Sequence, residues 1–127
     1  MQAPNETSAV RRAYDELRKA ANLRPYLEAD AREDLVDRLI KLFVKYEADI
    51  VTAISDDFGY RVRLETLAAD VWVPLDGARY ARRHLREWMQ RRVVNANPLF
   101  LPSQAYVQPV PLGVVGIIAP WNYPVDL

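Results

Sequence analysis

The sequence predicts an α/β protein in which helices come first and extended segments follow. All charged residues except Asp126 lie before Val93, whereas six of the nine prolines lie within residues 98–127. Because proline lacks a backbone N–H and disrupts the interior of a helix, helices are expected mainly before Val93. A third observation is the apolar run at residues 114–118, which is typical of a strand buried on both faces of a parallel or mixed sheet.

The composition indicates a folded protein without a strongly charged partner. Half of the 127 residues are apolar, 27% are charged, and the formal net charge is zero. A neutral chain lacks the positive field that attracts nucleic acid or anionic lipid, so neither is expected as a partner. The chain contains no cysteine, which excludes disulfides and a cysteine nucleophile within these residues. No signal peptide or transmembrane segment is recognisable, so the expected compartment is the cytoplasm.

Two N-terminal helices are predicted from apolar residues at helical spacing. The apolar face of the first comprises Val10, Tyr14, Leu17 and Ala21. This helix is expected to end near residues 24–25, where a proline follows. The apolar stripe of the second comprises Leu35, Leu39, Leu42, Phe43 and Tyr46. On the solvent side of the second helix, ion pairs are expected from Asp34 to Arg38 and from Asp37 to Lys41.

Two further helices are predicted before Val93. The apolar pattern continues to Gly59, which can adopt the left-handed conformation that closes a helix, so residues up to Phe58 form a third helix or a bent extension of the second. A long helix is predicted from Leu64 onward, with apolar positions at Leu67, Val71, Leu75, Ala78, Leu85 and Trp88. Pro74 removes one internal hydrogen bond and is expected to kink or divide this helix.

Beyond Val93 the pattern predicts two extended segments, residues 106–110 and 113–119, joined through residues 111–112. The second segment needs flanking strands and covering helices, which residues 1–127 do not provide. We therefore expect these residues to be the front part of a larger protein. The alternative is a small α+β domain whose apolar tail binds a partner.

Residues 111–124 read Pro-Leu-Gly-Val-Val-Gly-Ile-Ile-Ala-Pro-Trp-Asn-Tyr-Pro. This stretch resembles a strand and loop of the aldehyde dehydrogenase superfamily, whose pattern is PLGVVGxIxPWNxP. The preceding helices agree with the resemblance, including the Asp-x-Gly turn at residues 57–59. Residues 77–89 look most similar to the coniferyl aldehyde dehydrogenase branch, near the class 3 enzymes that act on fatty and aromatic aldehydes. The resemblance covers almost the whole chain.

The resemblance implies an N-terminal helical segment at residues 1–92 and an extended hairpin with an oligomerisation strand at residues 93–112. Residues 113–127 would then be the first strand and loop of a Rossmann-like cofactor domain, which is incomplete here. The implied reaction is oxidation of an aldehyde to its carboxylic acid with NAD or NADP, in an enzyme that forms a homodimer. The family's cysteine nucleophile, glutamate base and ribose-binding residues lie downstream of Leu127, so these residues alone are expected to be inactive.

The same resemblance assigns roles to the residues of the Pro-Trp-Asn-Tyr-Pro loop. Asn122 matches the oxyanion-hole residue, whose neutral side-chain amide donates a hydrogen bond to the developing alkoxide. Pro120 and Pro124 restrict the backbone on either side and help to fix that amide. The strand end that lies along the cofactor, near the ribose on the nicotinamide side, is matched by Ile118, Ala119, Pro120 and Trp121.

Each functional interpretation has a plainer alternative. Asn122 can be a turn residue whose side chain binds a nearby backbone group. His84, the only histidine, has no cysteine or carboxylate pair at ligand spacing, so no metal site is predicted. The arginine-rich residues 79–92 suggest nucleic-acid binding, but at zero net charge a solvated helix face with interface salt bridges is favoured.

Two alternatives concern the function of the whole chain. The acidic residues Glu65, Asp70 and Asp76 suggest a paired-carboxylate hydrolase, but they lie on or beside one helix without an environment that would raise a pKa. A non-catalytic remnant or interaction module, docking through the uncharged tail, is the main alternative to an enzyme.

Overall fold

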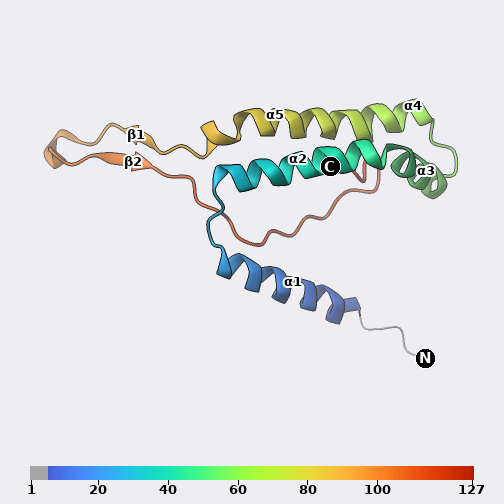
Figure 1. Ribbon diagram of the computed structural model, residues 1–127, viewed down its shortest axis with the longest axis horizontal. Coiled ribbons are helices and arrows are strands. Elements are labelled where there is room, and N and C mark those ends of the chain that lie inside the picture. Colours follow the sequence, from blue (N-terminus) through green and yellow to red (C-terminus); the bar gives the residue numbers. More distant parts are fainter. Residues whose placement is uncertain (1–5) are drawn as a thin grey trace. The chain divides into compact units, whose positions relative to one another are not determined.

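The computed structural model describes the backbone of residues 6–127 and the side chains of residues 9–127. Along the chain, helices come first and a two-stranded hairpin follows, as the sequence predicts (Figure 1). The described residues form two units. One contains residues 6–27 and Arg91–Ile117, and the other contains Glu28–Gln90 and Ile118–Leu127.

The first unit contains one helix and the hairpin. Helix α1 (Glu6–Leu23) ends just before the predicted position, and its apolar face remains exposed, with Val10 71% accessible. Strands β1 (Arg92–Val94) and β2 (Ala105–Val107) pair antiparallel, with Val93 opposite Tyr106. A short 3-10 helix, η2, lies in the connection between the two strands. The sheet of the described residues is therefore a short hairpin.

The structure differs from the prediction at residues 113–119. These residues form no strand, and the side chains of Ile117 and Ile118 are 82% and 97% exposed. A parallel strand forms only where neighbouring strands accept and donate its hydrogen bonds. No strand in residues 6–127 pairs with this segment, so its apolar side chains remain in contact with water.

The second unit is built on helices α2 (Ala29–Lys45) and α3 (Glu47–Phe58), followed by the long helical stretch described below. The third helix is separate from the second, and Gly59 closes it in the predicted left-handed conformation with φ of 77°. The buried residues of this unit that are apolar are Val51, Ile54, Val71 and Leu75. This small core lies where α3 meets the segments that follow it.

The predicted long helix consists of three consecutive segments: α4 (Arg63–Thr66), the π-helical segment η1 (Leu67–Trp72) and α5 (Val73–Trp88). Pro74 has no N–H to donate to the carbonyl of Asp70, four residues earlier. The N–H of Val73 bonds instead to the carbonyl of Ala68, five residues back, so the turn is wider there. The disturbance expected at Pro74 is confirmed, although the helix continues through it.

Helices α2 and α5 lie side by side and run in opposite directions (Figure 1). Arg82 on α5 binds Asp37 on α2, with 3.0 Å between Nε and Oδ1, and it also binds Glu33 at 3.2 Å. Asp37 therefore pairs across the helix contact, and the prediction that it pairs with Lys41 is wrong.

Arg86 completes this row of ion pairs between α2 and α5. Its Nε lies 2.7 Å from Glu33, and its Nη2 contacts Asp30 as well. These carboxylates, Glu33 foremost, raise the pKa of Arg86 above its ordinary value. The interface salt bridges expected for the arginine-rich stretch are therefore present at two of its members.

The apolar stripe of α2 is left partly uncovered within this unit. The exposed fractions of Leu35, Leu39 and Leu42 are 48%, 46% and 51%. The predicted pair between Asp34 and Arg38 is present on the same helix, at 2.6 Å. None of the helices in the described part of the chain is long and apolar enough to span a bilayer.

Candidate functional site

The predicted site residues lie in the segment Ile118–Leu127, which belongs to the second unit. Its backbone forms irregular turns from residue 121 onward, and the N–H of Leu127 bonds to the carbonyl of Tyr123 at 3.2 Å. The side chain of Asn122 is exposed, and no hydrogen bond joins its amide to any other described residue. Asn122 therefore lies in a turn, but its side chain does not bind a nearby backbone group as the local-turn interpretation requires.

The four residues predicted to line the cofactor directly precede Asn122. Ile118 and Trp121 are 97% and 88% exposed, Ala119 is exposed, and Pro120 is partly buried. The backbone of Ile118 and Ala119 makes no hydrogen bond with the described residues. This stretch therefore offers free backbone groups and apolar side chains on its surface.

Arg61 binds the backbone of the loop formed by residues 119–127, which is called the Asn122 loop below. It follows α3 after the turn at Gly59, and its side chain is only 3% exposed. Its Nη1 donates a hydrogen bond to the carbonyl oxygen of Asn122 at 2.9 Å. The guanidinium also lies over the rings of Phe58 and Tyr123, 4.9 Å from each centroid.

Asp70 is the second buried charge at this loop. It lies on η1 with no exposed surface, and its Oδ1 accepts a hydrogen bond from the backbone N–H of Val125 at 3.3 Å. Its Oδ2 lies 3.1 Å from Nη2 of Arg61, an ion pair that is close but not aligned as a hydrogen bond. Two opposite charges are thus buried together, and each also holds one main-chain group of the loop.

The surroundings of the Arg61–Asp70 pair leave little access to water. Glu65 approaches Nη2 of Arg61 at 3.6 Å from a half-exposed position. Thr66 is fully buried, and its hydroxyl has no hydrogen-bond partner among the described residues. Nε of Arg61 is buried without such a partner as well. Asp70 is therefore the buried counter-charge of the guanidinium, and Glu65 is a second, half-exposed one.

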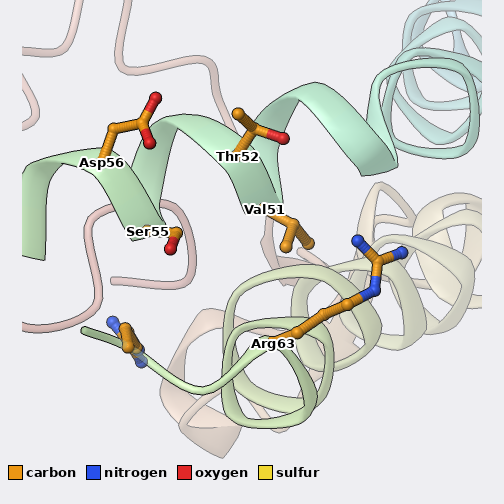
Figure 2. Close-up of a pocket in the computed structure, with 6 residues that line it drawn as sticks. Val51, Thr52, Ser55, Asp56 and Arg63 are labelled. Carbon is orange, nitrogen blue, oxygen red and sulfur yellow. The ribbon is translucent and has the colours of Figure 1, made fainter. Parts of the chain in front are cut away.

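A hollow of about 250 Å³ lies beside this pair, between α3 and the segment that leads into α4. Arg61 is one of its lining residues, and Figure 2 shows Val51 and Ser55 projecting from α3 toward the segment that carries Arg63. A second hollow lies within the hairpin connection and involves Asn97 and Phe100. Neither hollow includes Asn122 or residues 118–121, so the predicted site is an exposed loop.

The other residues considered as functional candidates, His84 and Asp70 among them, make structural contacts instead. His84 stacks on Tyr80 and Trp88, with ring centroids 4.1 and 6.0 Å away, as a helix-surface residue. In the described part of the chain, no group of three or more His, Cys, Asp or Glu side chains could hold a metal ion. Because Asp70 is bound to Arg61, a paired-carboxylate hydrolase has no free carboxylate at that position.

Sequence reasoning did not find the role of Arg61 or the pairing of Asp70. The sequence did contain a signal that Asp70 is buried. Asp70 directly precedes Val71, which is one of the apolar positions predicted to form the buried side of the long helix. Aspartate is almost never fully buried unless it is paired, so its place there indicates a cationic partner. No sequence pattern identifies which arginine that partner is, because the contact joins residues from different elements.

The aldehyde dehydrogenase family profile matches residues 2–127 of this chain. A probable coniferyl aldehyde dehydrogenase of Pseudomonas aeruginosa is 35% identical over 128 residues, covering 99% of this chain and 26% of that protein. A probable coniferyl aldehyde dehydrogenase of Caulobacter vibrioides is 39% identical over 113 residues, covering 86% and 23%. A family 3 aldehyde dehydrogenase of Macaca fascicularis is 35% identical over 89 residues, covering 70% and 18%.

The chain therefore belongs to the aldehyde dehydrogenase family, and its relatives include the coniferyl and family 3 members that the sequence resembles. It spans about a quarter of the length of the curated coniferyl aldehyde dehydrogenases that match nearly all of the chain. No solved structure matches the chain significantly.

Proposed function

We propose that this chain is part of an NAD(P)-dependent aldehyde dehydrogenase, in which Asn122 stabilises the oxyanion formed when the aldehyde is attacked. The strongest support comes from Asn122, whose main chain is bound by another residue while its side chain makes no hydrogen bond. Its carbonyl is bound by buried Arg61, whereas its exposed amide has no partner among the described residues. A donor that is fixed yet unused is what an oxyanion site requires.

The amide of Asn122 performs its task without changing its protonation state. A neutral N–H donor aimed at the developing alkoxide stabilises the transition state more than the uncharged carbonyl of the substrate. The main chain that carries it is held before the substrate arrives, which limits the reorganisation that accompanies the reaction. Removal of one such donor lowers kcat on the order of 10²- to 10³-fold in comparable sites.

Residues 118–121 are proposed to lie along NAD or NADP. The free backbone of Ile118 and Ala119 and the exposed surface of Trp121 fit a ligand with both polar and apolar faces. When bound, NAD or NADP would supply the hydride acceptor for the oxidation. Residues 118–121 of this chain would contact the nicotinamide side of the ligand.

The exposed apolar run supports a proposal about the fold of the whole enzyme. We propose that residues 113–119 become the first strand of a Rossmann-like cofactor domain, once neighbouring strands complete its hydrogen bonds. The hairpin in residues 93–112 is proposed to supply an oligomerisation strand in a homodimer. Its two-stranded sheet has unpaired edges on both sides, which is how strands from another subunit attach.

The proposed substrates are coniferyl aldehyde or another aromatic or fatty aldehyde. Two relatives that cover most of this chain are named probable coniferyl aldehyde dehydrogenases, and another carries the family 3 name. A panel of aromatic and long-chain aldehydes, compared by kcat/KM with NAD and with NADP, tests this choice. A preference for short polar aldehydes would contradict it.

The activity itself is tested on protein purified from its native source, by intact mass and by aldehyde-dependent formation of NAD(P)H. The expected result is turnover by a species much heavier than 127 residues, with kcat falling on the order of 10²-fold or more in Asn122→Ala. A species of 127 residues without turnover would instead support the interaction module. The half-exposed leucines of α2 are the observation that favours this second candidate.

A further inference from the structure

We propose that Arg61 and Asp70 are positioning residues, which clamp the main chain of the Asn122 loop so that its amide is fixed before the aldehyde binds. This inference rests on the proposed function for its catalytic consequence. Its structural part, that the pair orders the loop, stands on the contacts alone and is tested separately.

The two contacts bracket the centre of the loop. Arg61 binds the carbonyl of Asn122, and Asp70 binds the N–H of Val125, so the two residues between them are held at both ends. Both contacts use main-chain atoms of the loop, which leaves the side chain of Asn122 free. A clamp of this kind fixes where the side chain begins without occupying it.

The ring of Tyr123 adds a third contact to the same clamp. It lies 4.9 Å from the guanidinium of Arg61, which also faces Phe58 at the end of α3. A guanidinium can stack on aromatic faces and donate hydrogen bonds in its own plane at the same time, which a lysine ammonium cannot do. Tyr123 is therefore assigned a positioning role, as a ring held against Arg61.

Little else holds the loop. Within the described residues, its only other backbone hydrogen bond joins the N–H of Leu127 to the carbonyl of Tyr123. No strand ladder or helix includes residues 119–127. Since the loop has no regular structure to define its path, the contacts of Arg61 and Asp70 determine where Asn122 lies.

A buried ion pair is a poor device for stability alone. The desolvation of both charges offsets much of their attraction, and replacing such a pair with apolar side chains is often neutral or stabilising. Arg61 and Asp70 also leave buried polar atoms without hydrogen bonds, which an apolar pair would not do. The feature that an apolar pair cannot reproduce is the pair of hydrogen bonds to the loop.

The double variant Arg61→Met/Asp70→Leu separates these two roles because it replaces both charges with apolar side chains. We expect its stability to denaturant to remain close to that of the unaltered protein. The backbone amides of Val125 and Leu127, which are the hydrogen-bonded amides of the loop, should lose protection from hydrogen exchange because the clamp is gone. The matched control is Arg82→Met/Asp37→Leu, which removes an Arg–Asp pair between α2 and α5 and should leave this protection unchanged.

In the enzyme purified from its native source, the double variant should lower kcat on the order of 10²-fold, since displacing a catalytic group by about 1 Å has an effect of that size. The KM for the aldehyde should change much less, because the contact that is lost acts mainly in the transition state. The control pair should leave kcat within about twofold, as expected for a change remote from the loop.

Combining the double variant with Asn122→Ala shows whether the pair acts through Asn122. If it does, removing the pair in the Asn122→Ala background should lower kcat by less than about threefold, because the group being positioned is already absent. If the pair has a merely structural role, removing it should lower kcat by the same factor whether residue 122 is Asn or Ala. The Arg61→Lys variant keeps the charge beside Asp70 but lacks the planar, forked N–H donors of a guanidinium. Its kcat should therefore stay below that of the unaltered enzyme.

The outcomes separate the inference from the proposed function. If the unaltered enzyme oxidises no aldehyde, the proposed function fails, and hydrogen exchange still decides whether the pair orders the loop. If the enzyme is active but the double variant retains kcat and protection, the inference fails and the proposed function stands. Should the double variant unfold, Arg61→Lys supplies both readouts, and unchanged protection with unchanged kcat in that variant would overturn the inference.

Discussion

At the scale of single residues, Arg61 and Asp70 illustrate how a buried charge pair can be more costly to break than to remove. Asp70 has no exposed surface and Arg61 has almost none, so removing either residue would leave the other as a buried charge without its nearest counter-charge. The two residues come from segments on opposite sides of Glu65, and both reach the same loop. Their energetic coupling is therefore open to direct measurement.

We expect Asp70→Asn to destabilise the protein by roughly 3 to 5 kcal/mol, because it removes the buried counter-charge of Arg61 and leaves only the half-exposed Glu65. Chemical denaturation of the single variant and of Arg61→Met/Asp70→Leu measures the difference. The double variant should be the more stable of the two. If both lost the same free energy of unfolding, the pair would be stabilising in its own right and this account of it would be wrong.

The pKa of Arg86 allows a second expectation at this scale. Carboxylates of Glu33 and Asp30 raise that pKa, so the stabilisation from Arg86 is complete below its ordinary value and is lost only as the pH rises through the raised value. Between pH 6 and pH 10, Arg86 should therefore contribute no pH dependence. Comparing unfolding of the unaltered protein and Arg86→Met across this range tests it, and a difference that changed with pH would count against it.

At the scale of elements, the sequence was sufficient wherever local chemistry decides the structure. The first three helices, the left-handed Gly59 and the disturbance at Pro74 depend on spacing and on backbone limits of single residues, and all appear. The partner of Asp37 and the run at residues 113–119 depend on what lies beside them in space. The prediction for Asp37 was wrong because a neighbouring helix, absent from a local pattern, supplies its partner, and residues 113–119 form no strand where no neighbouring strand accompanies them.

Two glycines that differ only in backbone conformation provide a test at this scale. Gly59 has φ of 77° and Gly77 lies within α5, and an added Cβ would meet no atom within 4 Å at either position. We expect Gly59→Ala to destabilise the protein by about 1 to 2 kcal/mol, from left-handed backbone strain. Gly77→Ala should stabilise it by about 0.5 to 1 kcal/mol.

Thermal or denaturant unfolding of the two variants measures both effects. Because neither added Cβ creates a clash, the difference in stability between the two variants reflects backbone conformation and not packing. Equal and unfavourable changes in both variants would show that the end of α3 is not set by the conformation of Gly59.

At the scale of the whole molecule, apolar surface remains uncovered in both units. Residues 114–118 and the leucines of α2 together expose much of what the sequence pattern predicts to be buried. The chain also spans about a quarter of the length of its relatives. The Asn122 loop could be recognised from the sequence because its motif is contiguous. The contacts of Arg61 and Asp70 with this loop could be seen only in the tertiary structure, because they join distant parts of the chain.

The 127 residues expressed alone should expose this surface. We expect them to bind an apolar dye such as ANS and to associate with rising concentration, because contiguous apolar patches favour both. Dye fluorescence and sedimentation, compared with the protein purified from its native source, measure the difference. Equal and low dye binding by both would show that the exposed patches are smaller than the structure indicates.

The most direct test of the central claim is the rate of aldehyde-dependent NAD(P)H formation by the native-source enzyme with and without Asn122→Ala. The account predicts turnover in the unaltered enzyme and a loss of kcat on the order of 10²- to 10³-fold in the variant, with the variant still folded. Turnover that is unchanged by Asn122→Ala would contradict the assignment of Asn122 as the oxyanion donor.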